Sequence, residues 1–227
     1  MEPPDAVDYT GGLTTLPEYD NNRIGDCTCC AIANIITNNL AVAYNKHRIF
    51  ATEDVVNLYK NFGYNPLAVD QNGNNPTDGG AVVEDVINYV LKNGFMKHHF
   101  IGSAAVNPQN IVAVKRAIDL YGAIDIAIAL PLIWQTSNVW YMPPNPNITK
   151  QTLRGSWGGH CIMSAKYDEQ YLYVWSWGKL FAVEWAAFQF YVESVDVIIS
   201  ASWIKENVSP KKVDLTNLVT DLALLRG

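Results

Sequence analysis

Three of the four cysteines in this 227-residue chain lie within the stretch Gly-Asp-Cys-Thr-Cys-Cys, residues 25–30, directly before an apolar run. The run predicts a helix from Cys27 to about Tyr44, with Asp26 as its cap. A thiol at the start of a helix is favoured as the thiolate, because unpaired N–H groups and the helix dipole stabilise the anion. Gly25 allows the sharp turn that a substrate-facing loop needs. Cys27 is therefore the candidate nucleophile.

A nucleophilic cysteine needs a base, and histidine suits that role. His160 ends the glycine-rich stretch Gly-Ser-Trp-Gly-Gly-His and opens an apolar strand. Its ring is expected at a strand end, where the bare backbone of Gly159 can admit a substrate. The other histidines lie in polar stretches, so we pair His160 with Cys27. Residue types alone leave another interpretation open, in which Cys27 is a small buried apolar residue and His160 a hydrogen-bonded strand residue.

Other kinds of site fit these residues less well. Cys29 and Cys30 are expected to fill the core as small apolar side chains. A zinc site made from these thiols with His160 and Cys161 lacks a standard ligand spacing and would be structural. The loop 70–80 has too few acids for calcium, and the glycines before His160 lack the lysine that follows a phosphate-binding loop. We expect no metal and no cofactor.

The composition is that of a globular protein, with 49% hydrophobic and 17% charged residues. The net charge of -6 leaves no basic stripe for phosphates or anionic lipids, so neither nucleic acid nor a membrane is an expected partner. The N-terminal segment is acidic and rich in proline, without the apolar stretch of a signal peptide. We do not expect secretion by a signal peptide.

Hydrophobic periodicity changes near the middle of the chain. Helices are predicted in the first half, at residues 27–44, 52–63, 81–94 and 107–122, the last with Pro108 in its first turn. Strands are predicted in the second half, at residues 123–131, 160–168, 171–178, 180–185 and 194–201. The fold class is α+β, a helical N-terminal half packed against a mainly antiparallel β C-terminal half.

The predicted organisation is a single domain with additions at both ends. An extended N-terminal arm covers residues 1–20 and a C-terminal helix residues 213–227. The domain between them, residues 21–212, divides into a helical lobe at about 21–122 and a β lobe at about 123–204.

A cysteine that opens a long helix, followed much later by a histidine that opens a β half, resembles the papain-like cysteine peptidases. The segment Asp-Gly-Gly at residues 78–80, with its following helix, is similar to that family's Gly-Gly turn, and Trp-Ser-Trp-Gly at 175–178 resembles its Asn-Ser-Trp-Gly signature. The resemblance implies that Gly79 and Gly80 bind substrate, that Trp177 walls the cleft, and that Asn21, six residues before Cys27, helps to hold the oxyanion.

The sequence departs from that family at Trp175, where peptidases carry the asparagine that orients the histidine. Indole offers only a donor, so Ser176, a backbone carbonyl or an acid such as Asp125 would have to take that role. An alignment on Cys29 instead of Cys27 would place Arg23 at the oxyanion position. We prefer Cys27, because it keeps the Gly-x-Cys approach and the amide six residues back.

More closely, residues from about 3 to 225 resemble a family of papain-like proteins encoded by bacteriophages and bacteria. This resemblance implies a cysteine peptidase or amide hydrolase of phage origin, acting on a peptide or protein in the cytoplasm of a bacterial host. The alternative is a catalytically weak or inactive structural component of a phage virion, in the capsid or tail. Its partners would be other virion subunits, with the arm and the C-terminal helix as attachment elements.

Overall fold

The computed structural model of the chain describes residues 2–46, 48–201 and 211. The helix predicted at residues 213–227 lies outside them. The helices are α1 (Cys27–Tyr44), α2 (Thr52–Lys60), α3 (Val83–Asn93), α4 (Ile111–Tyr121) and α5 (Trp185–Tyr191), with a short 3-10 turn at Leu132–Trp134.

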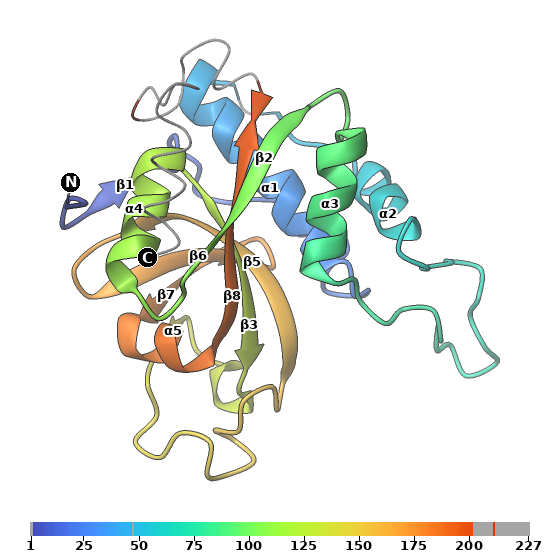
Figure 1. Cartoon of the computed structure of the whole chain (residues 1–227). Helices are drawn as coiled ribbons and strands as arrows, with labels where there is room; N and C mark the ends of the chain where they lie inside the picture. Colours follow the sequence, from blue (N-terminus) through green and yellow to red (C-terminus); the bar gives the residue numbers. More distant parts are fainter. Residues whose placement is uncertain (1, 47, 202–210, 212–227) are drawn as a thin grey trace.

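An eight-stranded sheet forms the centre of the molecule, in the order β2-β8-β3-β5-β6-β7-β4, with β1 pairing on β5. All pairings are antiparallel except that of β4 with β7. The strands are β1 (Val7–Asp8), β2 (Phe100–Val106), β3 (Ile124–Leu130), β4 (Val139–Trp140), β5 (Gly158–Tyr167), β6 (Tyr171–Ser176), β7 (Lys179–Glu184) and β8 (Val192–Ser200). Helices beside a mostly antiparallel sheet confirm the α+β class (Figure 1).

Helix α1 is almost wholly buried and packs against β5. It begins at Cys27 and ends before Asn45, whose left-handed backbone (φ 52°) closes the helix by donating to the Leu40 and Ala41 carbonyls. By length and composition α1 could cross a membrane, but most of it is covered by other parts of the chain. Asp26 occupies the N-cap position as predicted, although its side chain makes no capping hydrogen bond.

The sheet separates two hydrophobic clusters, and alternation along each strand decides which side chain enters which cluster. On β5, Ile162 joins the cluster under α4 and α5, whereas Met163 and Ala165 join the cluster under α1, α2 and α3. On β3 the predicted alternation is present, and Ile126 and Ile128 are both fully buried in the first cluster. One sheet therefore serves as the wall of both cores.

Several elements differ from the sequence prediction, among them the short strands β1 and β4, which were not predicted. The segment Phe100–Val106 forms β2, which pairs with β8, so the first half is not purely helical. The aromatic segment Trp185–Tyr191 forms α5, a short helix between β7 and β8. Helix α4 begins at Ile111, because the Asn110 side chain accepts a hydrogen bond from the Ala113 N–H. Pro108 consequently lies before this helix and not in its first turn.

The loop between α2 and α3 projects from the helical side of the molecule (Figure 1). Hydrogen bonds between residues of the loop hold it at its base and nearer its tip. At its base, the Asn75 side-chain amide donates to the Asn65 carbonyl at 2.8 Å. Nearer the tip, one Asp70 carboxylate oxygen accepts from the backbone N–H groups of Asn72 and Asn74. Leu67 is 89% exposed, so this loop buries little of its own apolar surface.

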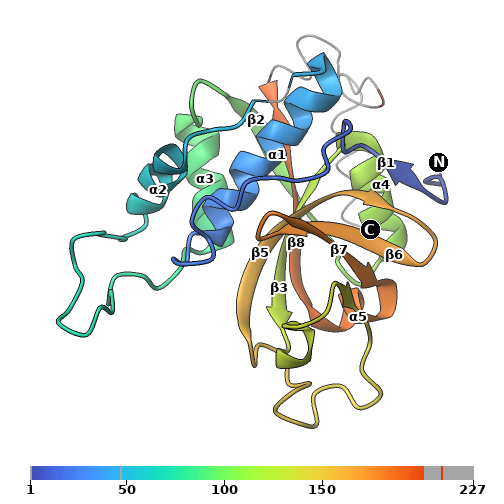
Figure 2. The same cartoon turned by 180° about the vertical axis from the view of Figure 1, so that it is seen from behind.

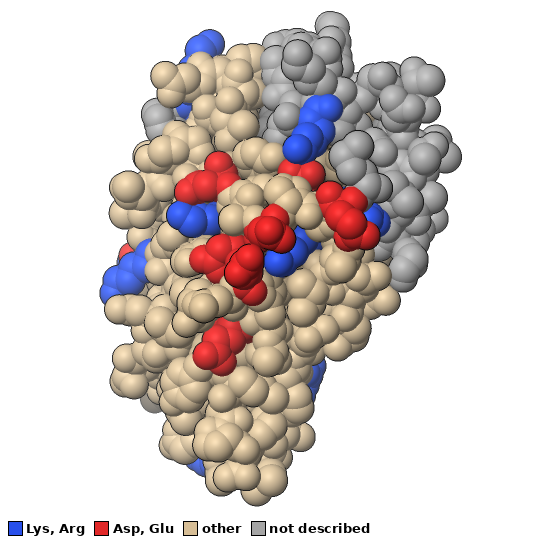
Figure 3. Space-filling model, turned by 90° about the vertical axis from the view of Figure 1, so that its left-hand side faces the viewer, with Lys and Arg blue, Asp and Glu red and all other residues tan. Residues whose placement is uncertain are grey.

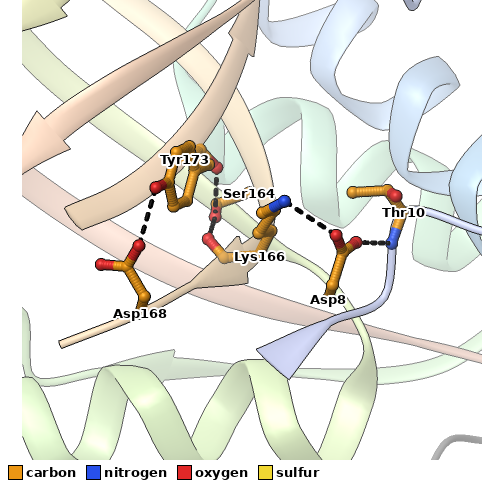
Figure 4. Close-up of polar contacts among 6 residues, drawn as sticks. All are labelled: Asp8, Thr10, Ser164, Lys166, Asp168 and Tyr173. Carbon is orange, nitrogen blue, oxygen red and sulfur yellow. Dashed lines mark hydrogen bonds and ion pairs between the residues drawn. The ribbon is translucent and has the colours of Figure 1, made fainter. Parts of the chain in front are cut away.

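The N-terminal arm lies along the chain's own elements. From behind, it runs from β1 across α1 (Figure 2), and the Asn34 amide of α1 donates to the Pro17 carbonyl. Strand β1 pairs with the end of β5, where Asp8 accepts from the Lys166 ammonium at 2.8 Å (Figure 4). Tyr167 donates to the Pro4 carbonyl. The arm is therefore held against the chain's own sheet and α1.

The surface that carries β1 and α4 has acidic side chains gathered around a few basic ones (Figure 3). Lys115 of α4 lies over the rings of Tyr167 and Trp185, at 5.1 Å and 5.3 Å from their centroids. Basic side chains on this face are separated by acidic and uncharged ones, so they form no continuous stripe.

Two substitutions beside the arm should differ in cost because of burial (Figure 4). Ser164 is fully buried and donates to the Tyr173 carbonyl at 2.7 Å, so Ser164→Ala should lower the free energy of unfolding by about 1–3 kcal/mol. Lys166 and Asp8 are partly exposed, so Lys166→Met should cost less than about 1 kcal/mol. Urea denaturation measures both values, and the reverse order would contradict this account of the β5 and β6 pairing.

Candidate active site

Cys27 is the first residue of α1 and the only one of the four cysteines that is not buried. Its sulfur accepts a hydrogen bond from the backbone N–H of Cys161 on β5, so the packing of α1 on β5 fixes the thiol against the sheet. Cys29 and Cys30 lie in the core under α1, as predicted for small apolar side chains. The exposure of the thiols therefore favours Cys27 over Cys29 as a reactive group.

His160 lies near the start of β5, with its imidazole held on two sides. Its Nε2 atom is 2.6 Å from the Ser176 hydroxyl, at the end of β6. Its ring stacks on the indole of Trp177, with centroids 4.3 Å apart and planes 9° apart, and Trp157 stacks on Trp177 in turn. Since Ser176 occupies Nε2, Nδ1 is the nitrogen left for a thiol. When Ser176 accepts from Nε2–H, Nδ1 carries the lone pair that a base needs.

The residue that contacts His160 Nε2 is Ser176, one position after Trp175, where the resemblance places the orienting asparagine. Trp175 is buried in the cluster under α1 and pairs with Met163 across the sheet. Alternation along β6 turns the next side chain, Ser176, to the other face, where it meets His160. The resemblance had left this role open between Ser176, a backbone carbonyl and Asp125. Asp125 instead accepts from the Cys161 thiol at 3.0 Å.

A cleft of about 450 Å³ contains both Cys27 and His160. It is a size typical of sites for small molecules and short peptide segments. Gly79, Gly80 and Gly159 also line it, as do the aliphatic side chains at the start of α3. The structure therefore brings together most of the residues predicted from the sequence, while their roles in catalysis and substrate binding stay predictions.

Asn21, Gly25 and Trp177 lie outside the lining of this cleft, although Trp177 stacks on the lining residue His160. Asn21 borders a separate small cavity with Cys161, Ser176 and Trp177. Its predicted part in an oxyanion hole therefore stays a prediction. The Gly25 N–H donates to the side chain of Asp78, the residue before Gly79.

A hydrogen-bond network that the sequence did not reveal joins Gly25, two residues before Cys27, with Gly79 and Gly80, which we call the glycine lip of the cleft. One Asp78 carboxylate oxygen accepts from the Gly25 N–H and from the Tyr59 hydroxyl, both at 2.8 Å. The same hydroxyl accepts from the Gly80 N–H at 2.8 Å. A Cβ atom at Gly25 would lie 3.1 Å from Asp78 Oδ1 and 3.2 Å from the Gly80 nitrogen, so any other residue here would require these neighbours to shift. The network sets the spacing between the thiol and the lip.

Burial keeps both members of the Cys27 and His160 pair uncharged in the empty cleft. Desolvation raises the pKa of Cys27 to about 11, and the neighbouring Asp26 carboxylate adds to that rise. Desolvation lowers the pKa of His160 to about 3. Asp26 is itself fully buried, which raises its pKa to about 7. The resting cleft therefore contains a neutral thiol and a neutral imidazole.

Metal ligation finds no support among the described side chains. No three His, Cys, Asp or Glu residues gather there in a way that could hold an ion. The Cys161 thiol, part of the zinc alternative, is bound to Asp125.

No protein-family model matches the sequence, and neither does any curated protein. Solved structures do resemble the fold. Xylellain, a cysteine protease from Xylella fastidiosa, has a TM-score of 0.65 and 17% identity, covering 88% of this chain and 87% of that chain. Procathepsin L 3 from Tenebrio molitor has a TM-score of 0.59 and 11% identity, covering 88% and 71%. Bromelain from Ananas comosus has a TM-score of 0.54 and 12% identity, covering 86% and 99%. The chain therefore has a papain-like fold.

The Asp78 network should stabilise the chain through its acceptor atom more than through its charge. Asp78→Ala removes the partner of Gly25 and Tyr59, and should lower the free energy of unfolding by about 1–3 kcal/mol. Asp78→Asn keeps an oxygen that can accept from both and should cost less. Urea denaturation, with amide exchange at Gly25, compares the variants. Equal losses in the two variants would contradict this role for the acceptor.

The pH dependence of alkylation should reveal the uncharged thiol. Because the pKa of Cys27 lies near 11, its thiolate fraction rises about tenfold per pH unit through the neutral range. Iodoacetamide should therefore label Cys27 slowly at about pH 6 and progressively faster toward pH 9. Mass spectrometry of the labelled peptide gives the rates, and Cys27→Ser provides the background from the buried thiols. Labelling as fast at about pH 6 as at pH 8 would show a stabilised thiolate instead.

Proposed function

We propose that the chain is a cysteine peptidase or a related amide hydrolase. The observation that carries this proposal is the placement of three groups. Cys27 opens a helix at one wall of the cleft, His160 lies on a strand in the same cleft, and Ser176 holds the far nitrogen of the imidazole. A nucleophile, a base and a group that orients the base are the parts that thiol catalysis requires.

In the proposed reaction, Nδ1 of His160 takes the thiol proton while the Cys27 sulfur attacks the carbonyl carbon of the substrate. The carbonyl oxygen becomes an oxyanion, which the unpaired N–H of Cys27 at the helix start can stabilise, with the Asn21 amide as a second donor. The intermediate collapses as the C–N bond breaks, and the imidazolium gives its proton to the leaving amine. Water, deprotonated by His160, then hydrolyses the thioester and restores the thiol.

The proposed substrate is an extended peptide segment. Gly79 is exposed and Gly80 half-buried at the edge of the cleft. The Gly80 N–H is bound to the Tyr59 hydroxyl, so the groups offered to a strand-like peptide are the Gly79 backbone and the Gly80 carbonyl. The Asp78 and Tyr59 network would hold this lip at a constant distance from Cys27. The papain-like neighbours include cysteine proteases, which supports this class of substrate.

A catalytically weak structural component of a phage virion is the second candidate, and phage origin is part of both proposals. One observation favours weak catalysis, namely that desolvation disfavours both charged forms of the Cys27 and His160 pair. A neutral thiol is a poorer nucleophile than a thiolate. Mass spectrometry of purified phage particles would test this candidate, which requires stoichiometric copies of the chain.

Peptide cleavage should depend on Cys27 and, more weakly, on Ser176. Cys27→Ala should abolish hydrolysis of fluorogenic peptides. Ser176→Ala should lower kcat by roughly ten- to a hundredfold with little change in KM, because the imidazole loses the hydrogen-bond partner of its Nε2 atom and not its contacts with the substrate. Ser103→Ala, on β2, is the matched control and should leave kcat unchanged. Hydrolysis that survives in Cys27→Ala, or none in the wild-type chain, would refute the proposal.

A further inference from the structure

A small cavity of about 10 Å³, separate from the cleft that contains Cys27, lies between α1, β5, β6 and the N-terminal arm. Two residues of its lining carry a buried polar atom that has no hydrogen-bond partner among the described residues, namely Nε1 of Trp175 and Oδ1 of Asn34. We propose that this cavity binds one water molecule, and that the water lets Ser176 hold His160 in the tautomer that thiol catalysis requires. This inference rests on the proposed function and adds Trp175 and Asn34 to it as positioning residues.

The two unpartnered atoms are complementary to a water molecule. An indole N–H only donates and an amide oxygen only accepts, so a water between them accepts from Trp175 and donates to Asn34. A buried polar group without a partner costs free energy, and ordered water satisfies such groups where the site is polar and large enough. The volume of this cavity matches about one water molecule. With both bonds made, the water keeps one lone pair and one proton for other groups of the lining.

Ser176 also lines the cavity, and its hydroxyl joins the cavity to the active site. This side chain is buried, and among the described residues the Nε2 atom of His160 is its one hydrogen-bond partner. A hydroxyl with a single acceptor gives its proton to that acceptor, which would leave the imidazole proton on Nδ1, the nitrogen that must take the thiol proton. With the water as a second acceptor, the hydroxyl donates to the water and accepts from Nε2–H. The lone pair is then on Nδ1, where a base needs it.

Trp175 thereby acts on His160 without contacting it. Trp175 and Ser176 are the last two residues of β6, and both line the cavity although their side chains alternate along the strand. A carboxamide oxygen beside the imidazole would need no water, because it can only accept. A hydroxyl needs an acceptor for its own proton before it can accept from Nε2–H. The water held by Trp175 and Asn34 supplies that acceptor.

Ala31→Val tests the proposal, because Ala31 lines the cavity from α1 and a larger side chain displaces the water without removing a polar group. Nitrogen-15 NMR of the histidines at about pH 7 reports the tautomer of the neutral ring, and His160→Ala identifies the signals of His160. The wild-type chain should carry the proton on Nε2, and Ala31→Val should carry it on Nδ1. Hydrolysis of fluorogenic peptides by Ala31→Val should show a kcat lowered roughly tenfold or more, with little change in KM. Ala33→Val, in the core under α1 and outside the cavity lining, is the matched control and should keep the wild-type tautomer and kcat.

The outcomes separate this inference from the proposed function. A crystal structure of the wild-type chain should place a water within hydrogen-bond distance of Trp175 Nε1 and Asn34 Oδ1, and a dry cavity would overturn the inference. A proton on Nδ1 in the wild-type chain would overturn it too, as would a proton that stays on Nε2 in a variant whose crystal structure has lost the water. Asn34→Leu, which removes the acceptor and fills the same space, repeats the test where Ala31→Val does not fold. Absence of hydrolysis in the wild-type chain would overturn the peptidase proposal, while the water and the tautomer would still decide this inference.

Discussion

The packing of α1 on β5 is the constraint from which the site follows. This helix is buried along most of its length, and its N-terminal thiol accepts a hydrogen bond from a backbone N–H of the strand. The start of α1 and the start of β5 are therefore held together by the packing of the core. His160 lies one residue before the strand residue that meets the thiol. A shift of α1 by one turn would separate the two functional groups while leaving each element intact.

The hydroxyl of Ser176 fills a place that an amide fills in the resembling peptidases, with a chemical difference. A carboxamide oxygen can only accept a hydrogen bond, so it enforces one tautomer of the imidazole. A hydroxyl can accept or donate, and its proton rotates to suit either tautomer. The stacked rings of Trp177 and Trp157 fix the orientation of the imidazole independently. This site therefore controls ring position firmly and proton position more loosely.

Periodic segments were predictable, and contacts between distant segments were not. The helix at Cys27 and the alternating strand β3 follow from patterns that local physics produces. Strand β2 contains Gly102 and Ser103 and lacks that alternation, so only its pairing with β8 defines it. The fold class and the Cys27 and His160 cleft could be predicted because the resemblance supplied the long-range pairing. Tyr59 reaches the lip across 21 residues of sequence, and no local signal marks such a contact.

The pairing of β3 with β8 shows the same limit at smaller scale. Its register shifts by one residue between Ala127 and Ile128, and the amino-acid pattern of the two strands does not mark that shift. The sequence left several candidates for the partner of His160, Ser176 among them. It gives the order of side chains along β6, but it does not give the register in which β6 pairs with β5. Burial could be anticipated for Cys29 and Cys30, yet its effect on the protonation of Cys27 depends on the assembled cleft.

Hydrogen bonds fix the base of the loop between α2 and α3, so the outer part of the loop can change without moving the base. Asp78 and Tyr59 anchor the end that carries the glycine lip, and the Asn65 and Asn75 contact closes the loop before that point. The entropy of closing a loop grows slowly, by about 0.6 kcal/mol for each doubling of length. Evolution or engineering can therefore lengthen the tip around Asn72, or graft a foreign epitope there, while the distance from the lip to the thiol stays the same. The glycine edge of the cleft and the outermost surface of the molecule are thus free to diverge at different rates.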